Sequence, residues 1–189
     1  MKNNINIALV GINYRSEDPK YDFFSITPHI LKACLLNSIY KDNIYTFQFY
    51  NDDILKKISK KILACNPTIV GFSSYIWNLE TIKKISKILK NHNKEILIVL
   101  GGPHVNQGKE LILNDRSIDL IVNGEGEITI IELVKSYTKY LKNNSKINFK
   151  NSNNIKNIKG ISFKNKNQII STKRNNLVDL NNIPSYILN

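Results

Sequence analysis

The feature that most constrains the fold of this chain is an alternation of short apolar runs with longer stretches of helical periodicity. The apolar runs cover residues 5–12, 45–50, 68–72, 96–100 and 118–122. Between and after them, apolar residues recur every three or four positions over residues 27–39, 54–63, 78–91, 107–114 and 125–141. Strands that are apolar throughout are buried on both faces, which is typical of a parallel sheet with helices packed on each side.

The pattern therefore predicts an α/β fold, namely a doubly wound, flavodoxin-like (Rossmann-like) three-layer sandwich with a five-stranded parallel sheet. Because crossovers between parallel strands are right-handed, the expected strand order is 2-1-3-4-5. Thr27 and Pro28 are expected to open the first helix, and Asn51 or Asp52 to cap the second. This domain is expected to span residues 1–142.

The remainder of the chain has a different character. Residues 143–157 are polar and low in complexity, which favours a linker or an exposed loop. Residues 158–163 and 168–171 flank the polar segment 164–167 and are predicted to form a small β-hairpin extension. Residues 177–189 read as an extended connector, so residues 158–189 are expected to lead towards a further domain.

The formal net charge of +12 is unevenly distributed along the chain. Residues 1–142 carry 19 basic and 14 acidic side chains, whereas residues 143–189 carry 8 and 1. A sequence this rich in Lys, Asn and Ile also reflects A/T-rich codons, so we do not expect a nucleic-acid partner. The apolar runs are shorter than the about 20 residues that span a bilayer, and the N-terminus shows no signal peptide. We therefore expect no membrane partner and a cytoplasmic location.

In a doubly wound sheet, ligands bind outside the carboxyl ends of the strands. The segment that follows the first strand, Gly11-Ile-Asn-Tyr-Arg-Ser, lacks the G-x-G-x-x-G pattern of a dinucleotide site and the phosphate loop of a flavodoxin. It also lacks the acidic pair of a phospho-acceptor receiver, and the chain has no Walker A motif. The usual nucleotide ligands of such folds are therefore not expected.

The other loops at this edge carry small and hydroxyl-bearing residues. Ser73-Ser74-Tyr75 ends the third strand and Gly101-Gly102-Pro103 ends the fourth, so that a bulky ligand could lie on the backbone. A purely structural alternative is that the glycines form a tight turn and the serines cap the next helix. The acidic loop 123–127 could likewise be helix capping, a metal site, a hydroxyl-binding site or an edge facing a second domain.

Taken in order, several motifs resemble the N-terminal cobalamin-binding region of cobalamin-dependent radical SAM enzymes. They are G-F-S-S-Y-I-W-N (71–78), V-L-G-G-P-H-V (99–105), D-L-I-V-N-G-E-G-E (119–127), I-K-G-I-S-F (158–163) and D-L-N-N-I-P-S (179–185). The resemblance runs from about residue 5 to the end of the chain. It implies that a corrinoid lies on the carboxyl edge of the sheet with its nucleotide tail buried alongside the strands.

The resemblance also assigns candidate cofactor-binding residues. Ser73 and Ser74 would hydrogen-bond the nucleotide tail, and Gly101 and Gly102 would make room for it. Tyr14 and its neighbours would lie near the lower face of cobalt, and the loop 124–127 would border the corrin edge or a catalytic domain. The full candidate set is Asn13, Tyr14, Ser73, Ser74, Tyr75, Gly101, Gly102, Pro103, His104, Gly124, Glu125 and Gly126.

Two departures from the family pattern shape the expected function. The loop after the first strand lacks the Asp-x-His-x-x-Gly that places an imidazole on cobalt, so we expect no metal ligand from the chain; His104 is a possible substitute but reads better as a hydrogen-bonding residue. Cys34 and Cys65 cannot form the Cys-x-x-x-Cys-x-x-Cys motif of a [4Fe–4S] cluster. The cluster and S-adenosylmethionine are therefore expected only in a radical SAM domain that this chain lacks, acting in cis or in trans.

The main functional hypothesis is thus a cobalamin-binding module for methyl transfer or another radical reaction, not catalytic on its own. An alternative is a degenerate flavodoxin-like module that binds proteins without a cofactor. A third hypothesis is a glycosyltransferase-type enzyme that holds a divalent metal on the acidic loop.

Overall fold

The computed structural model describes residues 5–38, 43–106, 109–141, 149, 152–174 and 184. Its centre is a seven-stranded sheet in the order β2-β1-β3-β4-β5-β6-β7. The first five strands are parallel: β1 (Ile7–Asn13), β2 (Ile44–Tyr50), β3 (Ile69–Ser73), β4 (Leu97–Gly101) and β5 (Leu120–Val122). The order expected for these five strands is confirmed, and their bounds lie within two residues of the expected ones.

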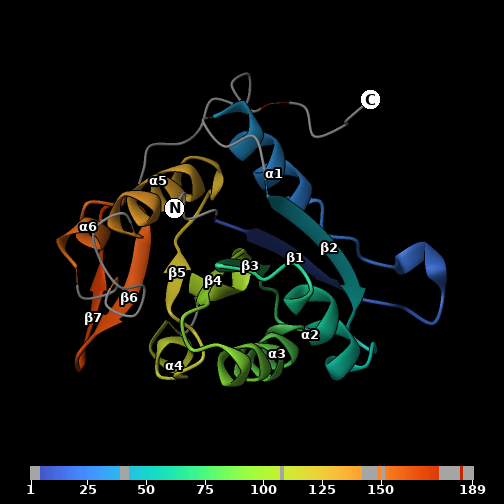
Figure 1. The fold of residues 1–189 in the computed structure, drawn as a ribbon. Helices are drawn as coiled ribbons and strands as arrows, with labels where there is room; N and C mark the ends of the chain where they lie inside the picture. Colours follow the sequence, from blue (N-terminus) through green and yellow to red (C-terminus); the bar gives the residue numbers. More distant parts are fainter. Residues whose placement is uncertain are drawn as a thin grey trace.

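Helices cover both faces of the sheet, as Figure 1 shows. One face carries α1 (Thr27–Asn37) and α5 (Glu127–Leu141), and the other carries α2 (Leu55–Leu63), α3 (Leu79–His92) and α4 (Lys109–Leu113). Successive side chains of each strand point to opposite faces, so the buried residues divide into two clusters. In β1, for example, Leu9 packs towards α1 and α5, whereas Val10 belongs to the cluster of α2 and α3.

The predicted hairpin forms, but it extends the main sheet, which therefore has seven strands where five were expected. Strand β6 (Ile161–Asn165) pairs antiparallel with β5, and β7 (Gln168–Ser171) pairs antiparallel with β6. The turn is also tighter than expected, because Asn165 pairs with Gln168 and leaves only Lys166 and Asn167 between the strands. Phe163 of β6 is fully buried in the cluster beneath α5, which explains the attachment.

The segment expected to be a polar linker or an exposed loop, residues 143–157, differs from that expectation in its described part. It contains α6 (Asn153–Lys156), and both Phe149 and Ile155 are buried in the cluster of α5. Phe149 packs edge-on against Tyr137 and Tyr140. The low-complexity stretch thus holds two apolar anchors that its polar composition obscured. The expected connector lies almost entirely outside the described residues.

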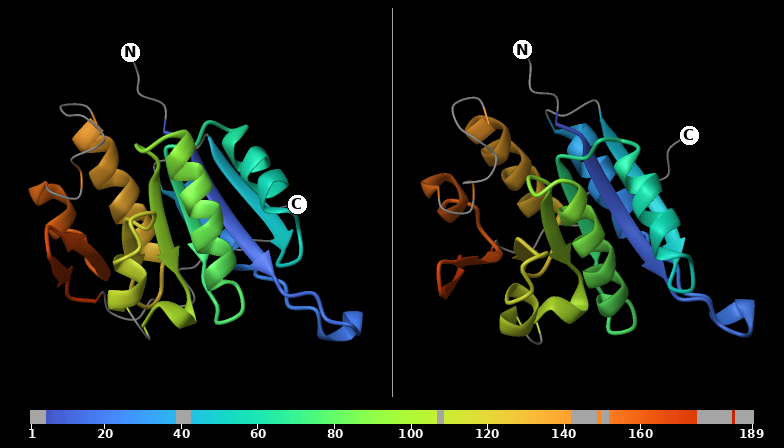
Figure 2. Two further views of the ribbon diagram at one scale, coloured as in Figure 1. Left: turned by 90° about the horizontal axis from the view of Figure 1, so that it is seen from below. Right: turned by 60° about the horizontal axis from the view of Figure 1, so that its bottom comes forward.

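Two further expectations concern helix starts. Thr27 and Pro28 do open α1. The proposed cap of α2 is wrong, because its N-cap is Ile54. Asn51 instead accepts a hydrogen bond from the Arg15 backbone amide, and the Asp52 carboxylate pairs with the Arg15 guanidinium at 3.6 Å. The loop between β1 and α1 extends away from the sheet as an arm with the 3-10 turn η1 (Pro19–Tyr21) at its tip (Figure 2).

Candidate functional site

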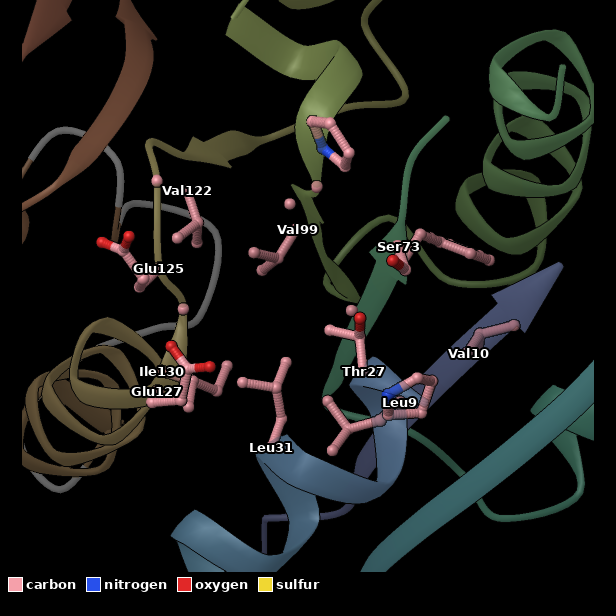
Figure 3. A pocket seen from close by; sticks show the side chains of 18 residues that line it. Leu9, Val10, Thr27, Leu31, Ser73, Val99, Val122, Glu125, Glu127 and Ile130 are labelled. Carbon is pink, nitrogen blue, oxygen red and sulfur yellow. The ribbon is translucent and has the colours of Figure 1, made fainter. Parts of the chain in front are cut away.

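A cavity of about 330 Å³ lies at the carboxyl ends of β1, β3, β4 and β5, between the sheet and the helix pair α1 and α5. Figure 3 shows this arrangement. The cavity is lined by Leu9, Val10, Thr27, Pro28, Leu31, Gly71, Phe72, Ser73, Val99, Gly101, Gly102, Pro103, Val122, Gly124, Glu125, Gly126, Glu127 and Ile130. Its place is the one that the doubly wound topology favours for a ligand.

The walls of the cavity are largely apolar. Leu9 of β1, Val99 of β4 and Val122 of β5 project towards the helices. Leu31 of α1 and Ile130 of α5 face them across the cavity (Figure 3). Of the described residues, none that lines the cavity is a Lys, an Arg or a His. The space therefore suits a flat, apolar group better than an anionic phosphate.

Ser73 supplies a polar group at the end of β3. The residue is 5% exposed, and its hydroxyl has no hydrogen-bond partner among the residues that the structure describes. A buried hydroxyl without a partner costs free energy that a ligand group can recover. The capping alternative for the serines does not hold, because the N-cap of α3 is Asn78, whose amide also donates to the carbonyls of Ile12 and Ser73.

The two glycines that end β4 play different structural roles. Gly102 has φ +105°, and a Cβ there would lie 2.5 Å from the carbonyl oxygen of Ser74, so the turn itself requires glycine. A Cβ on Gly101 would meet only the Cβ of Val122, at 3.8 Å. Gly101 thus leaves open space in the cavity that the fold alone does not demand.

The two carboxylates of the acidic loop, Glu125 and Glu127, have different surroundings. Glu125 accepts a hydrogen bond from the Arg174 guanidinium at 2.7 Å, which lowers the pKa of the Glu125 carboxyl. The same guanidinium lies against Gly124, which has φ +85°. Glu127, the first residue of α5, has a buried Oε2 without a hydrogen-bond partner in the described part of the chain. Glu125 therefore belongs to the rim and Glu127 to the cavity wall.

Five of the twelve expected site residues do not line the cavity: Asn13, Tyr14, Ser74, Tyr75 and His104. Asn13 is fully buried and joins neighbouring elements, since its Oδ1 accepts from the Ser25 amide and its Nδ2 donates to Gln48. Ser74 is also fully buried and its hydroxyl is unpartnered, while its backbone braces the turn at Gly101 and His104.

Tyr14 and Tyr75 belong instead to an aromatic cluster beside the cavity. Tyr75 stacks on Trp77 with ring centroids 4.7 Å apart, and Phe23 packs edge-on against both rings. Tyr14, 42% exposed, contacts Trp77 and forms a β-bridge with Phe23 across the arm. The first and third strands thus end in a partly exposed aromatic surface.

Residues of α1 contribute to the cavity wall although we did not predict them as site residues, and Glu127 was expected only as part of the loop 124–127. Thr27 and Leu31 lie one turn apart on α1, and their only sequence signal is that the helix begins at the carboxyl edge of the sheet. Glu127 belongs to the acidic loop in the sequence, but only the structure distinguishes its burial from the exposure of Glu125.

The described residues hold no group of three or more His, Cys, Asp or Glu side chains placed to bind a metal ion. Both cysteines are free, and burial together with the nearby charge of Glu127 raises the pKa of Cys34 to about 11. Cys34 is thus a protonated, inert thiol at neutral pH. No helix in the described part of the chain is long and apolar enough to cross a membrane.

Known proteins similar to this chain include methyltransferases. The chain is 39% identical over 83 residues to the uncharacterized methyltransferase PH0819 of Pyrococcus horikoshii, covering 43% of this chain and 18% of that protein. It is 32% identical over 69 residues to the cobalamin-dependent radical SAM methyltransferase TokK of Streptomyces tokunonensis, covering 36% of this chain and 10% of TokK. The chain therefore spans only about a tenth to a fifth of these relatives.

The fold is shared with a solved structure. The radical S-adenosylmethionine methyltransferase TsrM of Kitasatospora setae, solved with cobalamin and a [4Fe–4S] cluster bound, superposes with a TM-score of 0.56 at 14% identity. The match covers 93% of this chain and 30% of TsrM. The family model of the B12 binding domain matches residues 20–134, which is more than half of the chain and includes most of the cavity. This chain therefore belongs to the B12 binding domain family.

Proposed function

We propose that this chain is the cobalamin-binding module of a radical SAM enzyme that performs methyl transfer or another radical reaction. The observation that carries the proposal is the apolar cavity at the carboxyl edge, with the unpartnered Ser73 hydroxyl beside the open space at Gly101. Such a slot fits the aromatic base of a corrinoid nucleotide tail. The family match and the relatives' names support the same cofactor.

The residues divide the work of holding the cofactor. Ser73 would donate to or accept from the tail, Gly101 would leave it room, and Pro103, Gly124 and Gly126 would border it. The apolar walls would exclude water and fix the orientation of the tail. When bound, cobalamin supplies a cobalt centre that can carry a methyl group. We further propose that the aromatic surface of Tyr14 and Tyr75 would face the corrin ring, and that the chain would supply no imidazole ligand to cobalt.

The rest of the reaction requires a second domain. With Cys34 and Cys65 as its only cysteines, the chain cannot provide three thiolates for a [4Fe–4S] cluster. We propose that a radical SAM domain, in cis or in trans, supplies the cluster and S-adenosylmethionine. Free cysteines suit a reducing compartment, which supports action in the cytoplasm.

The test is whether the purified chain retains a corrinoid. After incubation with hydroxocobalamin and gel filtration, the protein peak should carry the visible corrin absorption at about one cofactor per chain. A colourless protein peak would refute the proposal. It would favour the protein-interaction alternative, for which charge reversal at Lys164, Lys166, Lys173 and Arg174 should abolish binding of a partner protein.

A further inference from the structure

Four polar side chains line the cavity: Thr27, Ser73, Glu125 and Glu127. Glu125 is paired with Arg174 at the rim, so its carboxylate is already satisfied. Glu127 is not equivalent, because its Oε2 is buried and has no hydrogen-bond donor. Figure 3 shows the Glu127 carboxylate beside Leu31 and Ile130, on the α5 wall of the cavity and apart from the Glu125 carboxylate.

The position of Glu127 at the start of α5 explains part of its presence but not its lack of a donor. A carboxylate in the first turn is favoured by the helix dipole, by about 0.3–1 kcal/mol. A carboxylate oxygen that is buried without a donor costs more than this gain. The missing donor is therefore expected from a ligand.

The cavity limits what that donor can be. An anionic group is disfavoured, because two carboxylates and no basic side chain line the space. The apolar walls of Leu9, Val99 and Val122 favour a ring. A nucleoside meets both requirements, because it contains a ring and can donate a hydrogen bond to a carboxylate. The donor would be either a sugar hydroxyl or a protonated ring nitrogen.

We propose that Glu127 is a cofactor-binding residue that accepts a hydrogen bond from the nucleoside portion of the corrinoid tail, and so selects corrinoids that carry a complete tail. This inference rests on the proposed function. Ser73 on β3 and Glu127 on α5 then contact the tail from opposite walls of the cavity. The Arg174 guanidinium at the rim, rather than the cavity wall, would meet the phosphate of the tail.

The test compares two ligands and three variants. Hydroxocobalamin carries the tail, whereas cobinamide has the same ring without the nucleotide, and both can be titrated by quenching of the fluorescence of the single Trp77. The wild-type chain should bind hydroxocobalamin more tightly than cobinamide. Glu127→Leu should weaken hydroxocobalamin binding about 10- to 100-fold, the usual effect of losing a buried hydrogen bond to a charged group, and change cobinamide binding less than twofold.

The remaining variants control for charge and identify the donor. Glu80→Gln removes an exposed carboxylate that pairs with Lys83 on the opposite helical layer, and it should leave both affinities unchanged. Glu127→Gln keeps an acceptor oxygen but removes the charge. Near-normal hydroxocobalamin binding by this variant would identify a sugar hydroxyl as the donor, and a loss as large as that of Glu127→Leu would identify a protonated ring nitrogen.

The failures are distinguishable. If the wild-type chain binds neither corrinoid, the proposed function is wrong and this inference with it. If it binds hydroxocobalamin and Glu127→Leu binds it equally well, only the inference is overturned. An equal loss for both ligands would also overturn it, since a disturbed fold rather than a lost contact with the tail would then be responsible. Thermal unfolding of each variant, followed by circular dichroism, checks that the fold persists.

Discussion

Replacing Gly101 by valine tests whether the space at the end of β4 exists for the cofactor. A Cβ at this position would have one neighbour within 4 Å, the Cβ of Val122 at 3.8 Å, which is an ordinary van der Waals contact. Gly101 is not one of the described glycines with a positive φ, so its backbone conformation is compatible with a side chain. The added methyl groups should enter the cavity and leave the fold intact.

Gly101→Val should change the stability of the cofactor-free chain and its affinity for hydroxocobalamin in opposite directions. Glycine within a strand costs about 0.5–1 kcal/mol relative to alanine, so Gly101→Val should leave the free energy of unfolding of the cofactor-free chain unchanged or slightly raised. Burial of an aromatic ring of about 150 Å² contributes about 4 kcal/mol, or about 1,000-fold in Kd. Valine obstructs only part of the cavity, so we expect a loss of hydroxocobalamin affinity of at least tenfold and at most about 1,000-fold.

The matched control is Gly102→Ala. Here the Cβ would lie 2.5 Å from the oxygen and 2.9 Å from the nitrogen of Ser74, and φ is +105°, so we expect a loss of stability of about 1–3 kcal/mol. Urea unfolding of the cofactor-free proteins and spectroscopic titration with hydroxocobalamin measure the two quantities separately. If Gly101→Val binds hydroxocobalamin like the wild type, the cavity is not the binding site. If it unfolds as easily as Gly102→Ala, the argument from open space is wrong.

Three further predictions concern stability. Asp119→Ala should lower the free energy of unfolding by about 3–5 kcal/mol in urea, because it removes a buried carboxylate that lies 2.6 Å from the Lys90 ammonium and accepts a hydrogen bond from the Ile98 amide; an effect below 1 kcal/mol would contradict this. Burial raises the pKa of the Cys34 thiol from 9.0 to about 11 in the folded chain. Between pH 9 and pH 11 the unfolded state therefore binds fewer protons than the folded state. Stability should therefore fall by about 2–3 kcal/mol more in wild type than in Cys34→Ala as the pH rises from 9 to 11, and equal slopes would refute the assignment. Lys166→Gly should raise the melting temperature slightly, because Lys166 has φ 53° in the hairpin turn, and a decrease would show that the turn gains from its side chain.

Hydrophobic periodicity was sufficient to predict the parallel part of the fold. A strand such as Leu97–Gly101 has no alternation because both of its faces are covered, and that property distinguishes it from a surface hairpin. The pairing of β6 with β5 could not be read in the same way. It depends on long-range burial of Phe163, and local sequence contains no information on which strand a hairpin will join.

For the candidate site too, the sequence predicts the position of a residue better than its contacts. Ser73 and Gly101 are the last residues of strands and Gly124 lies just beyond one, so topology alone places them at the carboxyl edge, and the structure finds them on the cavity wall. Asn13 is also the last residue of a strand, but its side-chain amide hydrogen-bonds the Ser25 backbone amide and the Gln48 side chain. Whether a polar side chain at this edge faces a ligand or its own backbone depends on atomic geometry, which residue type does not determine.

The antiparallel hairpin gives the acidic loop its shape. Because β6 descends from the carboxyl edge and β7 returns to it, the residues after β7 come back beside the end of β5. There the Gly160 amide donates to the Lys173 carbonyl, and the Asn123 amide donates to the Gly160 carbonyl, at 2.8 and 2.7 Å. Arg174 is thereby fixed over Glu125, and part of the basic excess of the last quarter of the chain neutralises the rim of the cavity. A strand pair that contributes no residue to the cavity wall thus decides which of the two glutamates of the loop is satisfied by the protein and which remains free for a ligand.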